Sequence, residues 1–599
     1  MQLSRLGQRP ALLAWGAAVL VFMAWLGRAD LHDPDEARHA EIAREMLVTG
    51  EYLTPRLEGQ PYHDKPPLFH WSLAASMSVL GTSAFAARLP SALAALWTLA
   101  MTAWWVRRAY SPGAASLAVL GLASATSFVL VGRYAIVDML FTALLTSAFA
   151  WLGVWLVEGD KRQRSIYPFY VLIGIATLAK GPVAIVLGSL MVVGVATLVA
   201  GTSARARLAP LTGLALTLAV AVPWYACAWM ADPAYIETFL WEHNLQRYAS
   251  QLRPHQGEPW YYYAVALPVG LLPWTFLVGV AVIAVVRERS KRIADVYALL
   301  WAAVVIGFFT TAGTRLLTYM LPAYPALASL TAGYLTERSG GAQIGYRLHR
   351  AAGLVWVGVL LVASVACAAC LIAWHGSVSP RLVLIVPLLA CALHAARRRS
   401  GAAILQTVAA SSLAALAILY GLAVDLVDAA RSVRPAAEIV AHELPGRAAI
   451  AAYGVPSHAL SFYSGRIATR TKDPDEVYGL LAGDRPAAVL TRPRHLADLG
   501  LDPLPDGVST RWMASDAVPY GGRRVLLFNS AAAREGDGGE GRESNPPPTV
   551  KAGITVLKTG RATGPDPSPC DVTARSRASR FAYSGARVSA TADRCRFDL

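Results

Sequence analysis

Residues 11–28 read "ALLAWGAAVLVFMAWLGR", and residues 31–50, almost directly after them, read "LHDPDEARHAEIAREMLVTG". The first stretch is apolar and long enough to cross a bilayer, because about 20 apolar residues span the hydrocarbon core as a helix that satisfies its own backbone. The second is dense in charges. Over all 599 residues, 55% are hydrophobic and 16% are charged, whereas soluble domains carry about 25% charged residues. The sequence therefore predicts an α-helical, polytopic membrane protein.

Further apolar segments follow along the chain, and we predict about thirteen transmembrane helices. They are expected near residues 11–28, 88–106, 114–131, 139–157, 167–179, 182–200, 208–224, 263–286, 294–311, 317–336, 352–373, 381–396 and 402–421. Lys and Arg collect in alternate connections, which predicts that the N-terminus is inside and that the charged stretch after the first span is outside. The first segment lacks a small-residue cleavage site, so we interpret it as a span and not as a signal peptide.

The composition divides the chain into three parts. A transmembrane domain is expected over residues 1–424, with its first outward loop at 29–87, followed by a small outward α/β domain at 425–530. The α/β interpretation comes from alternating helix-like and strand-like runs such as "RPAAEIVAHELP", "RAAIAAYG" and "PAAVLTR". The tail at 531–599 is rich in Gly, Pro, Ser and Arg, which predicts disorder. The net charge of +15 lies largely in the predicted inner loops and this tail, so it does not indicate a nucleic-acid partner.

The charged stretch after the first span begins like a helix. Asp33 is expected as the N-cap, with Pro34 at the first helical position and Glu36 three residues after the cap; Gly50 is placed to end the helix. Asp35 would then lie in the first turn, where the helix dipole favours a carboxylate, and Arg38 and His39 would share its face. The simpler alternative is an amphipathic helix on the membrane surface with solvated charges.

The other outward segments also carry ionisable side chains. The run "GQPYHDKPPLFHW" (residues 59–71) adds Tyr62, His63, Asp64 and Lys65, and its simpler interpretation is a surface loop. Later outward turns add Arg133, Asp138, Lys180, Glu242, His243, Asn244, Arg247, Tyr248, Arg253, His255, Arg315 and Tyr319. Ionisable groups near membrane depth are costly, and outward cations oppose the positive-inside tendency, so we predict that they converge on one outward site. Snorkelling or local pairing, for instance of Asp138 with Arg133, is the alternative for single residues. The mixture suits phosphate recognition with acid-base or metal chemistry.

Six of these motifs, in this order and spacing, resemble a known superfamily. They are "DPDEARHAEIAREML", "PYHDKPP", "GRYAIVD", "LAKG", "WEHNLQRY…H…PWYYY" and "TRLLTYMLP". The superfamily is that of the polyprenyl-phosphate-dependent glycosyltransferases and protein O-mannosyltransferases. Within it, the chain is most similar over about residues 30–530 to the bacterial aminoarabinose (4-amino-4-deoxy-L-arabinose) lipid A transferases.

This resemblance implies a GT-C type fold in the bacterial inner membrane, surrounded by membrane lipids, acting as a monomer with its active site facing the periplasm. The donor would be a sugar on undecaprenyl phosphate, and the acceptor lipid A or another envelope molecule. Transfer to a protein, as in the O-mannosyltransferases, is an alternative. A lipid-linked sugar transporter or flippase is another, although transporters hold ionisable groups near the bilayer midplane in repeated halves, and no repeat is visible here.

The resemblance also implies residue roles. Asp35 matches the essential carboxylate, and Arg38 and Lys65 match the cations beside it. The positions implied to bind donor or acceptor are His39, Tyr62, Asp138, Lys180, Arg247, Arg315 and Tyr319. Asp64 and His255 match positions that share a divalent metal, zinc or similar, in relatives. This chain has Asp64 where the aminoarabinose enzymes have Glu, and His39 where they have Tyr.

Overall fold

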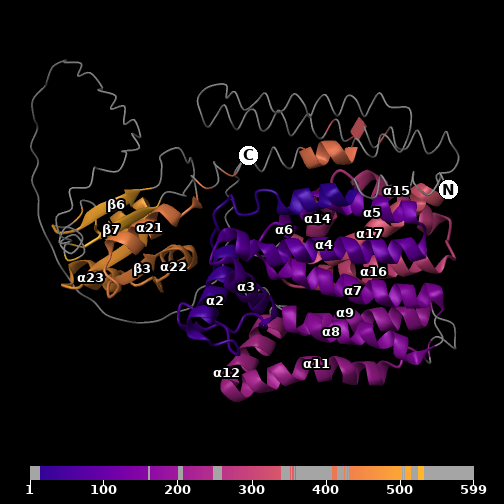
Figure 1. Ribbon diagram of the computed structural model, residues 1–599, viewed down its shortest axis with the longest axis horizontal. Helices are drawn as coiled ribbons and strands as arrows, with labels where there is room; N and C mark the ends of the chain where they lie inside the picture. The colour runs from indigo at the N-terminus through magenta and orange to yellow at the C-terminus, as the bar shows by residue number, and fades with distance from the viewer. Residues whose placement is uncertain are drawn as a thin grey trace, which may run out of the picture. The chain divides into compact units, whose positions relative to one another are not determined.

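The computed structural model (Figure 1) describes residues 14–159, 162–199, 207–246, 259–338, 408–414, 431–501, 506–513 and 524–529, with a few single positions between and after them. Residues 1–539 form one compact unit, and all contacts given below lie within it. The predicted tail and most of the three predicted spans after residue 351 lie outside the described residues.

Four described helices are long and apolar enough to cross a membrane: α4 (Ala84–Ala109), α7 (Val137–Glu158), α11 (Pro210–Ala231) and α16 (Ile293–Thr311). Each overlaps a predicted span, although α11 extends seven residues beyond the predicted end at 224. They lie side by side with the shorter helices α8 (Tyr167–Lys180) and α9 (Val183–Gly194), in contacts of α4 with α7, α7 with α8, and α8 with α11 (Figure 1).

Two predicted single spans are instead helix pairs with a sharp bend. Helices α5 (Pro112–Ala123) and α6 (Thr126–Gly132) meet at 69°, and α14 (Tyr262–Gly270) and α15 (Thr275–Arg287) meet at 114°. The second bend follows from Pro268 and Pro273, since proline removes a helical donor and disfavours the helical conformation of the residue before it. The two bends also bind each other, because the N–H of Thr126 donates to the Leu272 carbonyl at 3.0 Å. Backbone groups freed from one helix are thus satisfied by the other.

The described residues therefore hold four spans, or up to six if each bent pair counts as one, and the predicted number of about thirteen stays a prediction. Several predicted spans form shorter apolar helices, such as Ala14–Met23 and Val183–Val199. Further helical segments in this part of the chain include η1 (Gln163–Ile166), η2 (Val195–Val199), α12 (Pro233–Ile236), η3 (Glu237–Gln246), η5 (Leu317–Ala323), α17 (Tyr324–Gly333) and η6 (Tyr334–Arg338).

The first loop folds into helix α2 (Asp35–Thr49), a small hairpin of β1 (Arg56–Leu57) and β2 (Gln60–Pro61), and helix α3 (Leu68–Leu80). Gly50 ends α2, as predicted, and it does so in the left-handed conformation. The predicted N-cap is wrong: the cap residue is Pro34, without a side-chain bond. Asp33 instead accepts the backbone N–H of Ala459 at 3.1 Å, because a distant helix start competes for the same carboxylate.

Residues beyond 431 form a five-stranded sheet with helices. The helices are α21 (Arg434–Glu443), α22 (His458–Ser464), α23 (Pro474–Ala482) and α24 (Pro493–Asp498), and the strands are β3 (Ala449–Tyr453), β4 (Thr469–Thr471), β5 (Ala487–Thr491), β6 (Ser509–Met513) and β7 (Val525–Phe528). The strand order is β4-β3-β5-β7-β6, with β3 parallel to β4 and β5 and with β7 antiparallel to its neighbours. The short strands β4 and β6 and helix α24 were not predicted, since none has a long apolar pattern.

The sheet has two buried faces. Alternate strand residues point to opposite sides, so Leu490 and Leu526 join the core that contains α21 and α22, while Val489 and Leu527 join the core beneath α23. The first of these cores also includes α2 and α3. The sheet is thus continuous in packing with the loop that bears Asp35.

Candidate active site

Asp35 and Arg38 lie one turn apart at the start of α2, as predicted. Arg38 donates to the Asp35 carboxylate at 2.6 Å, and the Asp35 side chain is 45% exposed. Burial by itself would lower the pKa of Arg38. The acidic groups around it raise that pKa above its ordinary value, Tyr62 first, then Asp35 and Asp64. The guanidinium therefore stays charged, and within the described residues its buried Nε has no hydrogen-bond partner.

The loop after the hairpin brings Tyr62, Asp64 and Lys65 to this pair. The Lys65 ammonium donates to the backbone carbonyl of Asp64 at 3.0 Å, and the Tyr235 hydroxyl of α12 donates to the Lys65 carbonyl at 2.7 Å. His63, next in this loop, binds the Asp232 carboxylate at 2.7 Å. Contacts with residues 169 and 170 positions away thus fix the loop. The pairing of His63 with Asp232 was not predicted.

His39 occupies a different environment from the one the sequence suggested. It is buried, and its Nδ1 lies 3.0 Å from Nε2 of His70, which is also buried. Burial, and then the charges of Arg38 and Lys65, lowers the pKa of His70 to about 3, and burial likewise lowers the pKa of His39 well below its ordinary value. Both rings are neutral at physiological pH. His39 therefore lies behind the Asp35 face as a packing group, and His70 had no spacing signal that could have identified it.

A second group of predicted residues lies around Lys180 at the end of α8. Its ammonium is 2.5 Å from the Asp138 carboxylate, with side chains only 10% and 7% exposed. It also lies over the Tyr319 ring, 4.2 Å from the centroid. The alternative pairing of Asp138 with Arg133 is wrong, because Arg133 donates to the carbonyls of Val21 and Ala24. Arg315 donates to the Thr310 carbonyl at 3.1 Å.

The two groups adjoin through the start of α7. The Ala135 N–H, just before α7, donates to Glu36 of α2 at 2.9 Å, and Asp138 lies in the first turn of α7. The structure therefore brings Asp35, Arg38, Tyr62, Asp64 and Lys65 into one cluster, with Asp138, Lys180 and Tyr319 in the next. Arg247 and His255 lie outside the described residues.

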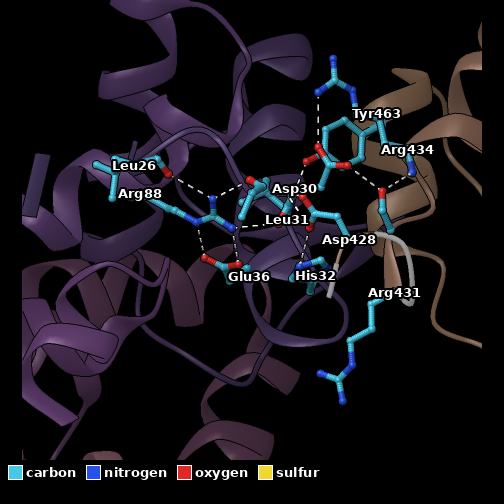
Figure 2. A network of polar contacts seen from close by, with 12 residues as sticks. Leu26, Asp30, Leu31, His32, Glu36, Arg88, Asp428, Arg431, Arg434 and Tyr463 are labelled. Atoms are coloured by element: carbon cyan, nitrogen blue, oxygen red, sulfur yellow. Dashed lines mark hydrogen bonds and ion pairs between the residues drawn. The ribbon is translucent and has the colours of Figure 1, made fainter. Parts of the chain in front are cut away.

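A buried ion pair supports this arrangement, and sequence reasoning missed it (Figure 2). Arg88 of α4 holds both Glu36 oxygens, at 2.8 and 2.7 Å, with side chains 4% and 0% exposed. Its other donors bind the carbonyls of Leu26, Ala29 and Asp30. Helix α2 is thereby fixed to α4 and to the segment that follows the first apolar helix, Ala14–Met23, one residue from Asp35.

No group of three or more His, Cys, Asp or Glu that could hold a metal is found in the described part of the chain. Asp64 is described, but its predicted partner His255 is not. The shared metal stays a prediction, and no chemical step is derived through it.

Comparison with known proteins bears on this geometry. The sequence model of the dolichyl-phosphate-mannose-protein mannosyltransferase family matches residues 64–227. The undecaprenyl phosphate-alpha-4-amino-4-deoxy-L-arabinose arabinosyl transferase of Edwardsiella ictaluri is 32% identical over 329 residues, 54% of this chain and 58% of that protein. The enzyme of the same name from Aeromonas salmonicida is 28% identical over 57% of this chain and 64% of the relative. The matches span less than two thirds of the length of these relatives.

Two crystal structures have the same fold. ArnT from Cupriavidus metallidurans bound to undecaprenyl phosphate has a TM-score of 0.70 at 21% identity, over 86% of this chain and 97% of that one. Its apo form has a TM-score of 0.70 at 23% identity, over 87% and 98%. The resemblance recognised in the motifs is therefore confirmed, and the chain has an ArnT-like, GT-C type helical fold.

Proposed function

We propose that this chain is a membrane glycosyltransferase that moves an aminoarabinose-type sugar from undecaprenyl phosphate to lipid A or another anionic envelope acceptor. The observation that carries the proposal is the Asp35 and Arg38 pair, 2.6 Å apart at a helix start and joined by Asp64 and Lys65. A partly exposed carboxylate surrounded by cations suits an acceptor oxygen on one side and a donor phosphate on the other.

In the proposed reaction, an acceptor oxygen forms a bond to the anomeric carbon of the sugar. The bond from that carbon to the donor phosphate oxygen breaks, and its electron pair leaves with undecaprenyl phosphate. Asp35 orients the acceptor and takes its proton if it carries one, while the hydrogen bond from Arg38 fixes the position of the carboxylate. For an acceptor phosphate, already anionic, positioning outweighs proton transfer.

The cations are assigned to the leaving phosphate. Lys65 and Arg315 are the first candidates, with Arg247 in the part of the loop that is not described. Lys180 already shares its charge with Asp138 at 2.5 Å. We therefore assign Lys180 to positioning the Tyr319 ring, with its two other ammonium donors left to a phosphate oxygen. His39 and Tyr62 are assigned to the walls of the site.

A divalent metal shared by Asp64 and His255 is part of the proposal; it would supply Lewis-acid stabilisation of phosphate charge. The active site is proposed to face the periplasm of a bacterial inner membrane, and the protein to act as a monomer. The match to the protein mannosyltransferase family keeps a protein acceptor as the second candidate.

The experiment replaces Asp35 by Asn in the purified chain and measures sugar transfer from undecaprenyl-phosphate-linked donor to lipid A by mass spectrometry. We expect a loss of about 100-fold or more, the usual effect of removing a positioned general base. Asp475→Asn is the matched control, since Asp475 is also a first-turn carboxylate but lies on α23. Transfer by Asp35→Asn at the wild-type rate would overturn the proposal. Donor translocation without any glycosylated product would favour a flippase.

A further inference from the structure

The end of the α/β sheet carries a pair of arginines that the proposed chemistry does not use. Thr491 pairs with Val525 in the antiparallel register of β5 and β7. Continued by one residue beyond the strands, this register places Arg492 opposite Arg524, and the charge of Arg492 helps to lower the pKa of Arg524. Like charges directly opposite each other destabilise a sheet unless something neutralises them. Arg494 follows two residues later at the start of α24.

The described residues offer these arginines no carboxylate within 4.0 Å, and the buried Nε of Arg492 has no hydrogen-bond partner among them. Within the described residues, the Arg524 guanidinium donates one hydrogen bond, to the backbone carbonyl of Arg431 at 2.6 Å. Burial, and then the charge of Arg494, lowers the pKa of Arg492 below its ordinary value. Burial also lowers the pKa of Arg524, and Asp33 is the acid that opposes this effect.

Topology places these cations at a position where open α/β sheets bind ligands. Strand β3 lies between its parallel neighbours β4 and β5, so the connections that leave β3 and β5 depart in opposite directions. Ligands bind outside the carboxyl ends of the strands at such a switch point. His495 closes one side of this switch point. Its ring packs so closely against Gly454 that a Cβ added to this glycine would lie 2.5 Å from the ring.

The other side faces the proposed active site. Leu490 and Leu526 point into the core shared with α22 and α2. Continued by one residue beyond β5 and β7, the same alternation gives Arg492 and Arg524 this direction. Asp33, whose charge acts on Arg524, lies two residues before Asp35. Burial raises the pKa of Asp33, which weakens this carboxyl as a counter-charge for Arg524.

We propose that Arg492 and Arg524 form a binding site for a phosphate group of the acceptor lipid. Guanidinium groups match phosphate oxygens in pairs, and each charge-assisted bond gains strength where burial has removed water. The proposal rests on the proposed function in one respect, the identity of the acceptor. An acceptor with more than one phosphate would present one to Asp35 and hold another at these arginines.

The test measures binding of lipid A to the full chain in neutral phosphatidylcholine nanodiscs, without donor. Arg492→Glu is expected to raise the Kd about tenfold or more, the effect of losing one charge-assisted contact, and Arg524→Gln should give the same direction. Arg485→Glu is the matched control, because Arg485 is exposed and precedes β5 at the opposite end of the sheet. It should change the Kd less than twofold.

Two further arms separate the sources of phosphate. Inorganic phosphate should compete with lipid A in the wild-type chain and not in Arg492→Glu, and dephosphorylated lipid A should bind both chains equally. Equal affinity of wild type and both arginine variants, or an equal loss in Arg485→Glu, would overturn the proposal. Because no turnover is involved, arginine-dependent binding by a chain without transferase activity would contradict only the proposed function.

Discussion

Arg88 is the residue whose removal the structure predicts to be most costly in the first-loop region. Arg88→Ala deletes two bonds to Glu36, at 2.8 and 2.7 Å, and three to backbone carbonyls (Figure 2). Glu36 would remain fully buried, with the Ala135 N–H at 2.9 Å as its remaining partner. Breaking a buried ion pair from one side costs about 3–5 kcal/mol, because an uncompensated charge stays behind. The free energy of unfolding should fall by that amount.

The assay is equilibrium unfolding of the purified chain in detergent micelles, followed by a double-mutant cycle. Arg88→Met combined with Glu36→Gln removes both charges and should recover at least about 2 kcal/mol of the single-variant loss. Arg434→Ala is the control within the same network: its side chain is 52% exposed and bonded to Asp30 and Glu438, so its loss should cost about 0–1 kcal/mol. A loss below about 1 kcal/mol for Arg88→Ala, or a double variant as unstable as the single one, would refute the reasoning.

The remaining predictions use other parts of the molecule. Lys180→Met leaves its carboxylate partner buried at 7% exposure, so unfolding free energy should fall by about 3–5 kcal/mol; an unchanged value would show that the pair is solvated. Burial raises the pKa of Glu41 from 4.5 to about 7, so its contribution to stability is complete below pH 4.5 and is lost as the pH rises through 7. Glu41→Gln should remove a slope of up to about 1.4 kcal/mol per pH unit in that window, measured by unfolding at several pH values. Gly213→Ala would place a Cβ 2.1 Å from the Tyr170 ring, which is held by its hydroxyl bond, and should cost about 1–3 kcal/mol. Gly121→Ala meets nothing within 4 Å and should be neutral or stabilising in the same unfolding assay.

Local patterns predicted much of the fold. The positions of α4, α7, α11 and α16 follow from apolar length, and the end of α2 follows from Gly50. The pairing of Asp35 with Arg38 follows from helical spacing alone, because residues three apart share a face. These features depend on neighbours within one or two turns, which the sequence displays directly.

The bends in two of the predicted spans were harder to predict from the sequence. Pro268 and Pro273 mark the second bend, but the first has no proline and depends on Leu272, whose carbonyl accepts the Thr126 N–H. A backbone group can leave its helix inside an apolar environment only where another segment satisfies it. That partner lies 146 residues away, beyond any local period.

By itself, the sequence determined that this is a multi-span membrane protein and that a dense run of charged residues follows the first span, because apolar length and helical spacing are local properties. Only the tertiary structure decided which of those charges are buried and paired and which stay partly exposed. Asp33 binds the start of α22, Glu36 is buried against Arg88, and His39 lies against His70. Each of these partners comes from a distant segment, and burial changes the charge that a side chain can hold. Asp35, between two carboxylates that are engaged elsewhere, is the one left partly exposed beside Arg38.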